Sequence, residues 1–256
     1  MKRITIGTRA SKLALIQTSE VVERLHQQWP NLEISIEQIR THGDHITDVP
    51  LTQIGGDGVF VTEIERALSE KRIDLAVHSL KDLPTVQPNG LCLVIVGPRE
   101  DVRDVLIWSS EHKDPGYPSE YSRGDPLRSP WPINPIMPHS EHTANLRIGT
   151  CSLRRTAQVR VLYPNAEILP LRGNVDTRLR KLDAGEYDGI VLAAAGLHRL
   201  GVPERITDRM TYLPIDRMMP APGQGALALE MRDEPEMRAL VAPLNDPVAQ
   251  AATSAE

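Results

Sequence analysis

The stretch Ile148–Arg155 reads IGTCSLRR, and it indicates how this chain folds. Ile148 and Gly149 end a predicted strand. A short polar turn follows them and leads into a segment with a helical pattern. Ile6–Thr8 reads IGT near the start of the chain and again separates a strand from a helix. A strand-turn-helix unit that occurs twice predicts two similar α/β domains.

Two further matches repeat in the same order in both halves of the chain. Pro30–Ile34 (PNLEI) corresponds to Pro164–Ile168 (PNAEI). A leucine, an aspartate and a valine also share one spacing in the two halves, as Leu68, Asp74 and Val77 and then as Leu182, Asp188 and Val191. These matches support the prediction of an internal duplication.

Strands and helices alternate through the first half, which is typical of parallel α/β sheets. Ile73–Val77 predicts a strand, Ile64–Leu68 a helix, and Leu91–Val96 a fully buried strand. The loop Gly55–Gly58 opens that helix and resembles a phosphate cradle. No Walker lysine follows the loop, however, and Asp57 would repel an anion.

Residues 109–145 interrupt the second half and contain seven prolines. Neither the helical nor the strand periodicity survives there. This composition predicts a long exposed loop, and a variable insertion without function is the favoured interpretation.

The composition excludes several classes of function. The chain of 256 residues has a formal charge of -5 and 40% hydrophobic residues, with no apolar run long enough to span a membrane. Aromatic residues make up 4%, and a net acidic chain is a poor match for nucleic acid. No metal-ligand motif is present, and two cysteines are too few for a disulfide framework. We expect a cytoplasmic protein without a metal.

Basic side chains gather in one region of this acidic chain. Residues 147–199 hold nine basic and five acidic side chains. Arg154 and Arg155 follow a strand-end turn, and Arg172 and Arg199 also fall at element ends, so a shared anion site competes evenly with a solvated helix face. In open α/β sheets, ligands bind beyond the carboxyl ends of strands, so we expect Arg9 and the residues near it to face this cluster across a cleft.

A second group of polar residues follows the strand Ile73–Val77. His78–Pro84 reads HSLKDLP, in which Asp82 could act as a general acid or base and Lys81 stands beside it. A salt-bridged turn is the favoured interpretation of this motif alone. The PGQGA segment Pro222–Ala226 reads as a turn into a strand.

Taken together, these motifs closely resemble hydroxymethylbilane synthases, also called porphobilinogen deaminases. The resemblance runs from Ile6 to the last residues and is interrupted by the proline-rich insertion. It rests on six ordered segments: Thr8–Leu15 (TRASKLAL), Ala76–Pro84 (AVHSLKDLP), Gly149–Arg155 (GTCSLRR), Leu171–Val175 (LRGNV), Ala195–Leu200 (AGLHRL) and Pro222–Ala226 (PGQGA).

The resemblance implies an α/β fold of two periplasmic-binding-protein-like domains with a cleft between them. Residues 1–99 with about 221–241 would form domain 1, and about 100–220 would form domain 2 with the insertion. Residues 242–256 would begin a small third α+β domain that is otherwise absent. The family also suggests a monomer.

The implied activity is a transferase step of tetrapyrrole, porphyrin and heme biosynthesis. Four porphobilinogen molecules are joined head to tail with release of ammonia, on a dipyrromethane cofactor. The implied catalytic residue is Asp82. The implied substrate- and cofactor-binding residues are Arg9, Ser11, Ser79, Lys81, Thr150, Cys151, Ser152, Arg154, Arg155, Arg172, Gly173 and Arg199.

Three departures from the family stand out. Neither Cys92 nor Cys151 matches the cysteine that carries the cofactor, which lies in the third domain. We therefore expect a fragment, a split enzyme with its third domain on another polypeptide, or a lapsed homologue, in that order. The family usually has lysine at the positions of Gln53 and Asp57, and the insertion is unusual. The rival interpretation is a noncatalytic two-domain protein that binds a polycarboxylate or pyrrole.

Overall fold

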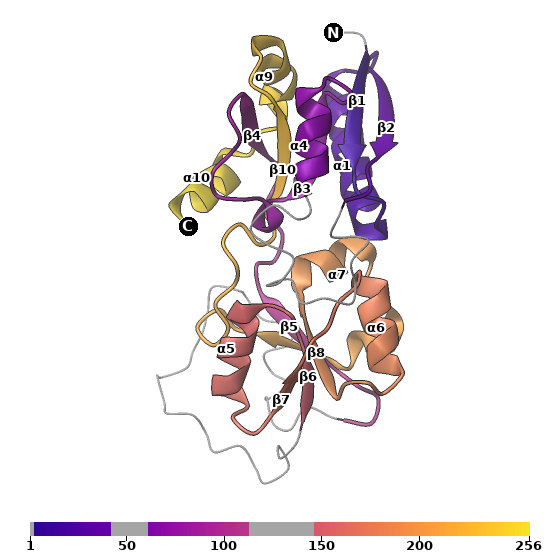
Figure 1. The fold of residues 1–256 in the computed structure, drawn as a ribbon, viewed down its shortest axis with the longest axis vertical. Coiled ribbons are helices and arrows are strands. Elements are labelled where there is room, and N and C mark those ends of the chain that lie inside the picture. The colour runs from indigo at the N-terminus through magenta and orange to yellow at the C-terminus, as the bar shows by residue number, and fades with distance from the viewer. Residues whose placement is uncertain (1–2, 42–60, 113–145) are drawn as a thin grey trace. The chain divides into compact units, whose positions relative to one another are not determined.

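The computed structural model describes residues 3–41, 61–112 and 146–256. The chain divides into two units, Met1–Glu100 with Pro222–Glu256 and then Asp101–Ala221. Each unit is built around a five-stranded sheet (Figure 1). The Gly55–Gly58 loop and residues 113–145 of the insertion lie outside the described residues.

The first unit has the strand order β2-β1-β3-β10-β4. Strands β1, β2 and β3 are parallel, whereas β10 runs antiparallel to both of its neighbours. Its strands are β1 (Arg3–Thr8), β2 (Glu33–Gln38), β3 (Leu75–Ser79), β4 (Leu91–Val96) and β10 (Leu227–Arg232). Its helices are α1 (Lys12–Gln28), α4 (Thr62–Ser69), α9 (Pro235–Val241) and α10 (Pro247–Ala255), with short turns η1 (Leu80–Asp82) and η4 (Ala242–Leu244).

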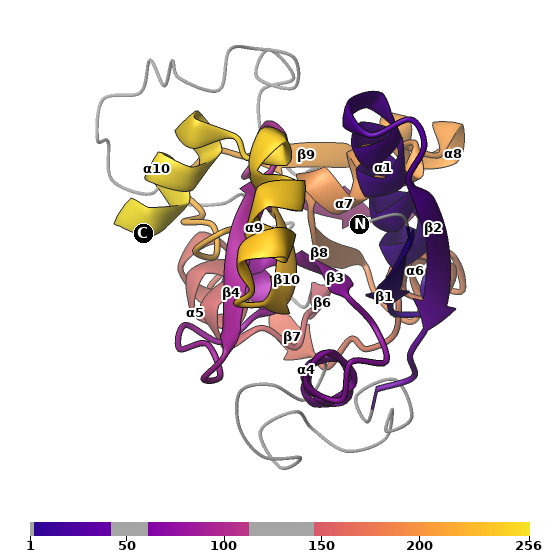
Figure 2. The same cartoon turned by 90° about the horizontal axis from the view of Figure 1, so that it is seen from above.

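Side-chain alternation along the strands gives this sheet two buried faces. Val77 and Leu229 point to the face covered by α1 and α9, where Leu25 and Met237 complete the core. The opposite face carries Ala76 beneath α4. Figure 2 shows α1 and α9 on one side of the sheet and α4 on the other.

The second unit repeats this plan with the strand order β7-β6-β8-β5-β9. Strands β6, β7 and β8 are parallel, and β5 runs antiparallel to β8 and β9. Its strands are β5 (Asp104–Trp108), β6 (Arg147–Gly149), β7 (Glu167–Leu169), β8 (Gly189–Ala193) and β9 (Met210–Leu213). Its helices are α5 (Leu153–Leu162), α6 (Val175–Asp183), α7 (Ala194–Leu200) and α8 (Glu204–Thr207).

Two hydrophobic clusters cover the two faces of the second sheet. Leu179 of α6 and Leu197 of α7 pack with Ile190 on one face. Val159 of α5 and Tyr163 pack with other core residues on the opposite face. Both sheets are therefore buried on both sides, which is the α/β arrangement that the alternating elements predict.

The same aspartate contact fastens β3 to β1 in the first unit and β8 to β6 in the second. Asp74 Oδ2 accepts from the backbone N–H of Thr5 at 2.8 Å, and Asp188 Oδ2 accepts from that of Arg147 at 2.7 Å. The other carboxylate oxygen accepts from a guanidinium, that of Arg232 at 3.0 Å or of Arg147 at 2.7 Å. The spacing match found in the sequence thus corresponds to one structural device used twice.

The turn that follows α4 in the first unit is repeated after α6 in the second. The N–H of Lys71 donates to the carbonyl of Leu68 at 3.0 Å, and that of Gly185 donates to the carbonyl of Leu182 at 3.0 Å. Both turn residues adopt the left-handed conformation, with φ of 58° at Lys71 and 74° at Gly185. A residue with a side chain is strained in this conformation. Lys71 therefore lowers the stability of the first unit, whereas Gly185 avoids the strain in the second.

One strand differs from its sequence-based expectation, and the expectation for residues 242–256 stays a prediction. Leu91–Val96 forms a strand, but it lies at the sheet edge and residues 92–94 are only half-buried, so the expectation of a fully buried strand was wrong. Residues 242–256, expected to begin a third domain, pack within the first unit. Ala249 of α10 lies in a cluster with Ile95 and Ala228.

The repeated turn predicts opposite effects of two glycine exchanges. Lys71→Gly relieves left-handed strain and is expected to raise the free energy of unfolding by about 1 kcal/mol. The matched Gly185→Ala introduces that strain where a Cβ meets nothing within 4 Å, and is expected to lower it by about 1 kcal/mol. Urea unfolding measures the free energy of unfolding of both variants. A less stable Lys71→Gly protein would show that Lys71 is not strained.

Candidate functional site

In the first unit, four of the predicted site residues meet at the carboxyl ends of the parallel strands β1 and β3. Arg9 and Ser11 follow β1, whereas Ser79 ends β3 and Asp82 lies in η1 directly after it. All four line one small pocket of about 60 Å³, together with His78. Two segments distant in sequence thus supply an arginine, two hydroxyls and a carboxylate to one place.

Hydrogen bonds fix the polar walls of this pocket, which is called the Asp82 pocket below. Ser11 caps α1 by accepting from the N–H of Ala14 at 3.2 Å. Ser79 Oγ accepts from the amide of Gln17 at 3.0 Å, which joins the end of β3 to α1. The hydroxyl of Ser11 is therefore already used as an acceptor, and its O–H remains a donor for a ligand.

The PGQGA loop supports the turn that carries Asp82. The N–H of Leu80 donates to the carbonyl of Ala226 at 3.0 Å, and Lys81 Nζ donates to the side chain of Gln224 at 3.3 Å. Gly223 has φ of 67°, and a Cβ there would lie 2.7 Å from Leu80 Cγ. The sequence interpretation of this segment as a plain turn missed its contact with the turn that carries Asp82, because the contact joins segments far apart in the chain.

In the second unit, the predicted site residues follow three strands that are neighbours in the sheet. Strands β7, β6 and β8 are adjacent and parallel, so their carboxyl ends lie at one edge. Thr150–Ser152 follows β6, Arg172–Gly173 follows β7, and α7 with Arg199 follows β8. The parallel order places three of the predicted ligand-binding segments at the same sheet edge.

The Thr150–Ser152 loop leads into the N-terminus of α5. Thr150 Oγ1 accepts from the N–H of Ser152 at 3.1 Å, and Ser152 Oγ caps the helix at the N–H of Arg155. Cys151 between them is half-buried. Backbone N–H groups and the positive end of a helix dipole gather here, which suits an anionic group.

Arg154 and Arg155 both pair with one buried aspartate. Arg155 Nη2 lies 2.7 Å from Asp104 Oδ1, and its Nη1 donates to the carbonyl of Val191 at 3.1 Å. Arg154 Nη1 lies 2.7 Å from Asp104 Oδ2 and also contacts the carbonyl oxygen of Met219. Neither arginine belongs to a plain solvated helix face, because Asp104 is fully buried and Arg155 is 7% exposed.

The charges around Asp104 determine its ionisation. Burial alone would raise the pKa of Asp104, but the charge and hydrogen bonds of Arg155, with those of Arg154, outweigh burial and hold that pKa below its ordinary value. Asp104 therefore stays ionised at neutral pH and holds Arg155 in the core. Arg155 has few donors left for a ligand, whereas Arg154 is more exposed.

The segment after β7 presents basic groups around a glycine. Arg172 is half-buried, and Gly173 has φ of 109° with a hypothetical Cβ 2.7 Å from Thr177 Cγ2. Asn174 caps α6 by accepting from the N–H of Thr177 at 2.9 Å. Arg178 Nε donates to the carbonyl of Gly173 at 2.7 Å and adds a cation that the sequence analysis did not name. The sequence could have indicated Arg178, because this residue lies one turn into the helix that follows Gly173.

Contacts of the preceding residue fix the end of α7 that carries Arg199. His198 Nε2 lies 2.8 Å from the hydroxyl of Tyr212 on β9. The guanidinium of Arg103 lies 4.6 Å from the centre of the Tyr212 ring, and Asp101 pairs with Arg103 at 2.6 Å. This chain of contacts orders the helix end on which Arg199 stands.

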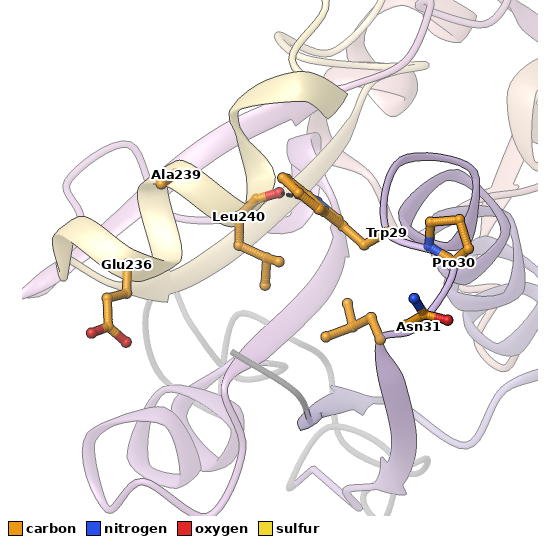
Figure 3. Close-up of a pocket in the computed structure, with 7 residues that line it drawn as sticks. Trp29, Pro30, Asn31, Glu236, Ala239 and Leu240 are labelled. Atoms are coloured by element: carbon orange, nitrogen blue, oxygen red, sulfur yellow. Dashed lines mark hydrogen bonds between the residues drawn. The ribbon is translucent and has the colours of Figure 1, made fainter.

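A larger hollow in the first unit contains none of the predicted site residues. This cavity of about 630 Å³ is lined by Trp29, Leu32, Leu240 and their neighbours, and Trp29 Nε1 donates to the carbonyl of Leu240 at 3.0 Å (Figure 3). Glu236 is the one ionisable residue that lines it. The smaller Asp82 pocket is the candidate site, because it brings a carboxylate, an arginine and an imidazole together.

Across residues 3–41, 61–112 and 146–256, the structure contains no cluster of three His, Cys, Asp or Glu side chains suited to a metal ion. Within the same residues, no helix has the length and apolar character needed to cross a membrane.

Comparison with known proteins decides the family. Residues 4–239 match the family model described as porphobilinogen deaminase, dipyromethane cofactor binding domain. The chain is 44% identical over 254 residues to the porphobilinogen deaminase of Syntrophobacter fumaroxidans, covering 99% of the chain and 73% of that protein. It is 47% identical to that of Roseiflexus castenholzii, covering 99% and 75%. The chain belongs to the porphobilinogen deaminase family.

Solved structures share the fold of this deaminase family member at low identity. The LysR-family transcriptional regulator CbnR has a TM-score of 0.50 at 10% identity, covering 98% of this chain and 70% of that one. This likeness concerns the fold alone. Together with the family match, it confirms the periplasmic-binding-protein-like α/β class that the sequence resemblance implied.

The buried Asp104 predicts a large loss of stability on neutralisation. Asp104→Asn leaves Arg155 buried without its counter-charge and is expected to cost about 3 kcal/mol in the free energy of unfolding at pH 7. Asp183 also pairs with two arginines, Arg205 and Arg209, but is far more exposed than Asp104, so the matched Asp183→Asn is expected to cost less than about 1 kcal/mol.

The pairing of Asp104 with its arginines also predicts how the stability of the protein changes with pH. Because its folded pKa is depressed, Asp104 contributes stability that is full above its unfolded pKa of about 3.9 and is lost as pH falls through the folded value. Urea unfolding between pH 7 and pH 3 should show a smaller decline for Asp104→Asn than for the unchanged chain. Parallel declines would show that folding does not lower the pKa of Asp104.

Proposed function

We propose that this chain carries the substrate-binding and catalytic residues of a hydroxymethylbilane synthase, which joins four porphobilinogen molecules head to tail and releases ammonia. The single observation that carries the proposal is the Asp82 pocket, in a chain whose family is porphobilinogen deaminase. The relatives from Syntrophobacter and Roseiflexus carry that name over nearly the whole length of this chain.

Asp82 suits the charge that this reaction creates. Loss of ammonia from porphobilinogen leaves an electrophilic pyrrole with positive charge on its nitrogen. A carboxylate beside the pyrrole N–H stabilises that charge and can take or return protons. Asp82 is exposed at the mouth of the pocket, and Ser79 and Arg9 stand in the same walls.

The arginines suit the carboxylates of the substrate. Every pyrrole ring of the growing chain bears an acetate and a propionate side chain, and guanidinium groups bind carboxylates in bidentate geometry. We assign Arg9, Arg154, Arg172 and Arg199 to this task. Arg155 serves it mainly by holding Asp104 and the start of α5 in place. Thr150, Cys151, Ser152 and Gly173 shape the loops that present these groups, and Ser11 and Lys81 add donors.

The donor set fits the dipyrromethane cofactor, which supplies the primer to which pyrroles are added. Its carboxylates match the loops after β6 and β7, where helix N-termini and arginines gather. Covalent attachment of the cofactor would also need a reactive cysteine thiolate. Burial raises the pKa of the Cys92 thiol, which disfavours the reactive thiolate, and this residue lies on the edge strand β4.

We propose that the cofactor thiol comes from a further segment or a separate third-domain polypeptide. The support is that neither cysteine of the chain stands at the family's attachment position. We also propose a cytoplasmic monomer, supported by two free cysteines and the family resemblance. The second candidate, a noncatalytic polycarboxylate- or pyrrole-binding protein, is favoured by the same lack of a matching thiol.

The thiol argument predicts the behaviour of the purified chain. Its intact mass should equal that of the unmodified polypeptide, and Ehrlich's reagent should give no dipyrromethane colour. Adding the C-terminal domain of the Syntrophobacter relative as a separate polypeptide should produce bilane from porphobilinogen. A covalent adduct on the chain alone would refute the claim about its cysteines. Binding without turnover in every combination would favour the noncatalytic candidate.

Asp82→Asn predicts a separation of binding from turnover. The amide keeps the size of the side chain but cannot stabilise positive charge, so we expect turnover to fall by at least about 100-fold. The affinity for porphobilinogen, measured by calorimetry, should change less than about threefold. Asp216→Asn, at an exposed aspartate outside the pocket, is the matched control and should leave both quantities unchanged. Normal turnover of Asp82→Asn would remove Asp82 from its assigned role.

A further inference from the structure

A buried pair of ionisable groups lies directly behind the Asp82 pocket. His78 Nε2 lies 3.1 Å from Glu230 Oε2, and the two side chains are 5% and 0% exposed. His78 lines the pocket, whereas Glu230 does not. The proposed function gives neither of them a role so far.

The sheet register explains why these two side chains meet. On the antiparallel strands β3 and β10, His78 pairs with Ala228 and Ala76 pairs with Glu230. His78 and Glu230 are therefore diagonal neighbours on one face of the sheet, within reach of long side chains. Val77 and Leu229 point to the opposite face and join the other core cluster.

A third carboxylate approaches the pair from the helix that covers this face. Glu65 belongs to α4, whose apolar residues pack over Ala76. Burial, followed by the charge of Glu230, raises the pKa of Glu65, while His78 partly opposes that rise. On β4, burial raises the pKa of Cys92, and Glu230 contributes to that shift as well. A carboxyl group on α4 thus approaches Glu230, and His78 faces it from β3, whereas Cys92 pairs with Met231 and packs on the opposite face of the sheet.

The pair has unused hydrogen-bonding capacity. In the described part of the chain, neither oxygen of Glu230, nor Oε1 of Glu65, nor Nε2 of His78 has an aligned hydrogen-bond partner. Among those same residues, His78 is the one basic side chain within ion-pair distance of Glu230. A fully buried carboxylate without a donor is costly, so its obvious partner is a proton on His78 Nε2.

We propose that Glu230 is a positioning residue that holds the proton of His78 on Nε2 and leaves Nδ1 for the substrate in the Asp82 pocket. A histidine is oriented by the hydrogen bond of its other nitrogen, and a carboxylate that only accepts selects the N–H tautomer on its own side. Resting on the proposed function, this assigns Nδ1 as an acceptor for an N–H group of porphobilinogen, beside the carboxylate of Asp82.

Nitrogen-15 NMR on the full chain tests the tautomer without any turnover. His78 is assigned among the eight histidines by the loss of its signals in His78→Gln. In its neutral form, the unchanged protein should show a protonated Nε2 and an unprotonated Nδ1 at His78. A proton on Nδ1 instead would overturn the proposal, even if every Glu230 variant failed to fold.

Substitutions at Glu230 test its effect on the reaction. Glu230→Leu removes the acceptor and should release the tautomer preference and lower kcat about tenfold or more, with KM changed less than twofold. Glu230→Gln keeps one acceptor oxygen and should restore part of both. Glu65→Gln, which mimics a protonated carboxyl on the neighbouring helix, should behave like the unchanged protein.

The outcomes separate this inference from the proposed function. An unchanged His78 tautomer in Glu230→Leu would refute the role of Glu230, whatever happens to turnover. A released tautomer with unchanged kcat would show that Nδ1 does not serve the reaction. An absence of turnover in the unchanged protein with its thiol-bearing domain would instead contradict the proposed function, and the NMR result would still decide the tautomer.

Discussion

The strand ends of both units depend on the contact made by the aspartate directly before β3 and before β8. Asp74 and Asp188 each accept from the first strand's backbone with one oxygen and from an arginine with the other. The parallel pairing between these strands is short, two residue pairs in each unit. A charge-assisted anchor at the start of so short a ladder fixes where both strands end. The pocket residues after β1 and β3, and the loops after β6 and β8, take their positions from it.

The duplicated scaffold carries different chemistry in its two halves. In the first unit, the loop after β1 supplies Arg9, and the turn after β3 supplies Asp82. In the second unit, the equivalent strand ends supply basic groups, and the buried carboxylate of Asp104 is neutralised by Arg154 and Arg155. A free carboxylate there would repel the acetate and propionate groups of a pyrrole chain. The two arginines neutralise the buried Asp104, whereas Asp176 in the first turn of α6 remains exposed.

The sequence predicted most of the fold and part of the site, for reasons that can be traced. Periodicity and the repeated IGT and aspartate spacings located the strands, because they depend on residues close in sequence. The edge position of β4 was missed, since strand order is set by β10, which arrives from the end of the chain. The pairing of Arg155 with Asp104 was missed for the same reason, because the two residues are 51 positions apart. Motifs name the residue types that a site needs, but long-range contacts decide which of them remain available to a ligand.

Strand β10 also links the parts of the first unit's site. Strand β10 enters the sheet between β3 and β4, preceded by the PGQGA loop. Gly223 leaves room for Leu80, Gln224 holds Lys81, and Ala226 accepts from the turn that bears Asp82. Three residues after Leu227, the same strand places Glu230 against His78. Because β10 and the loop before it contact both the turn that bears Asp82 and the histidine in the pocket wall, a shift in the register of β10 would displace both together. The site therefore constrains β10 more tightly than the hydrophobic core alone would.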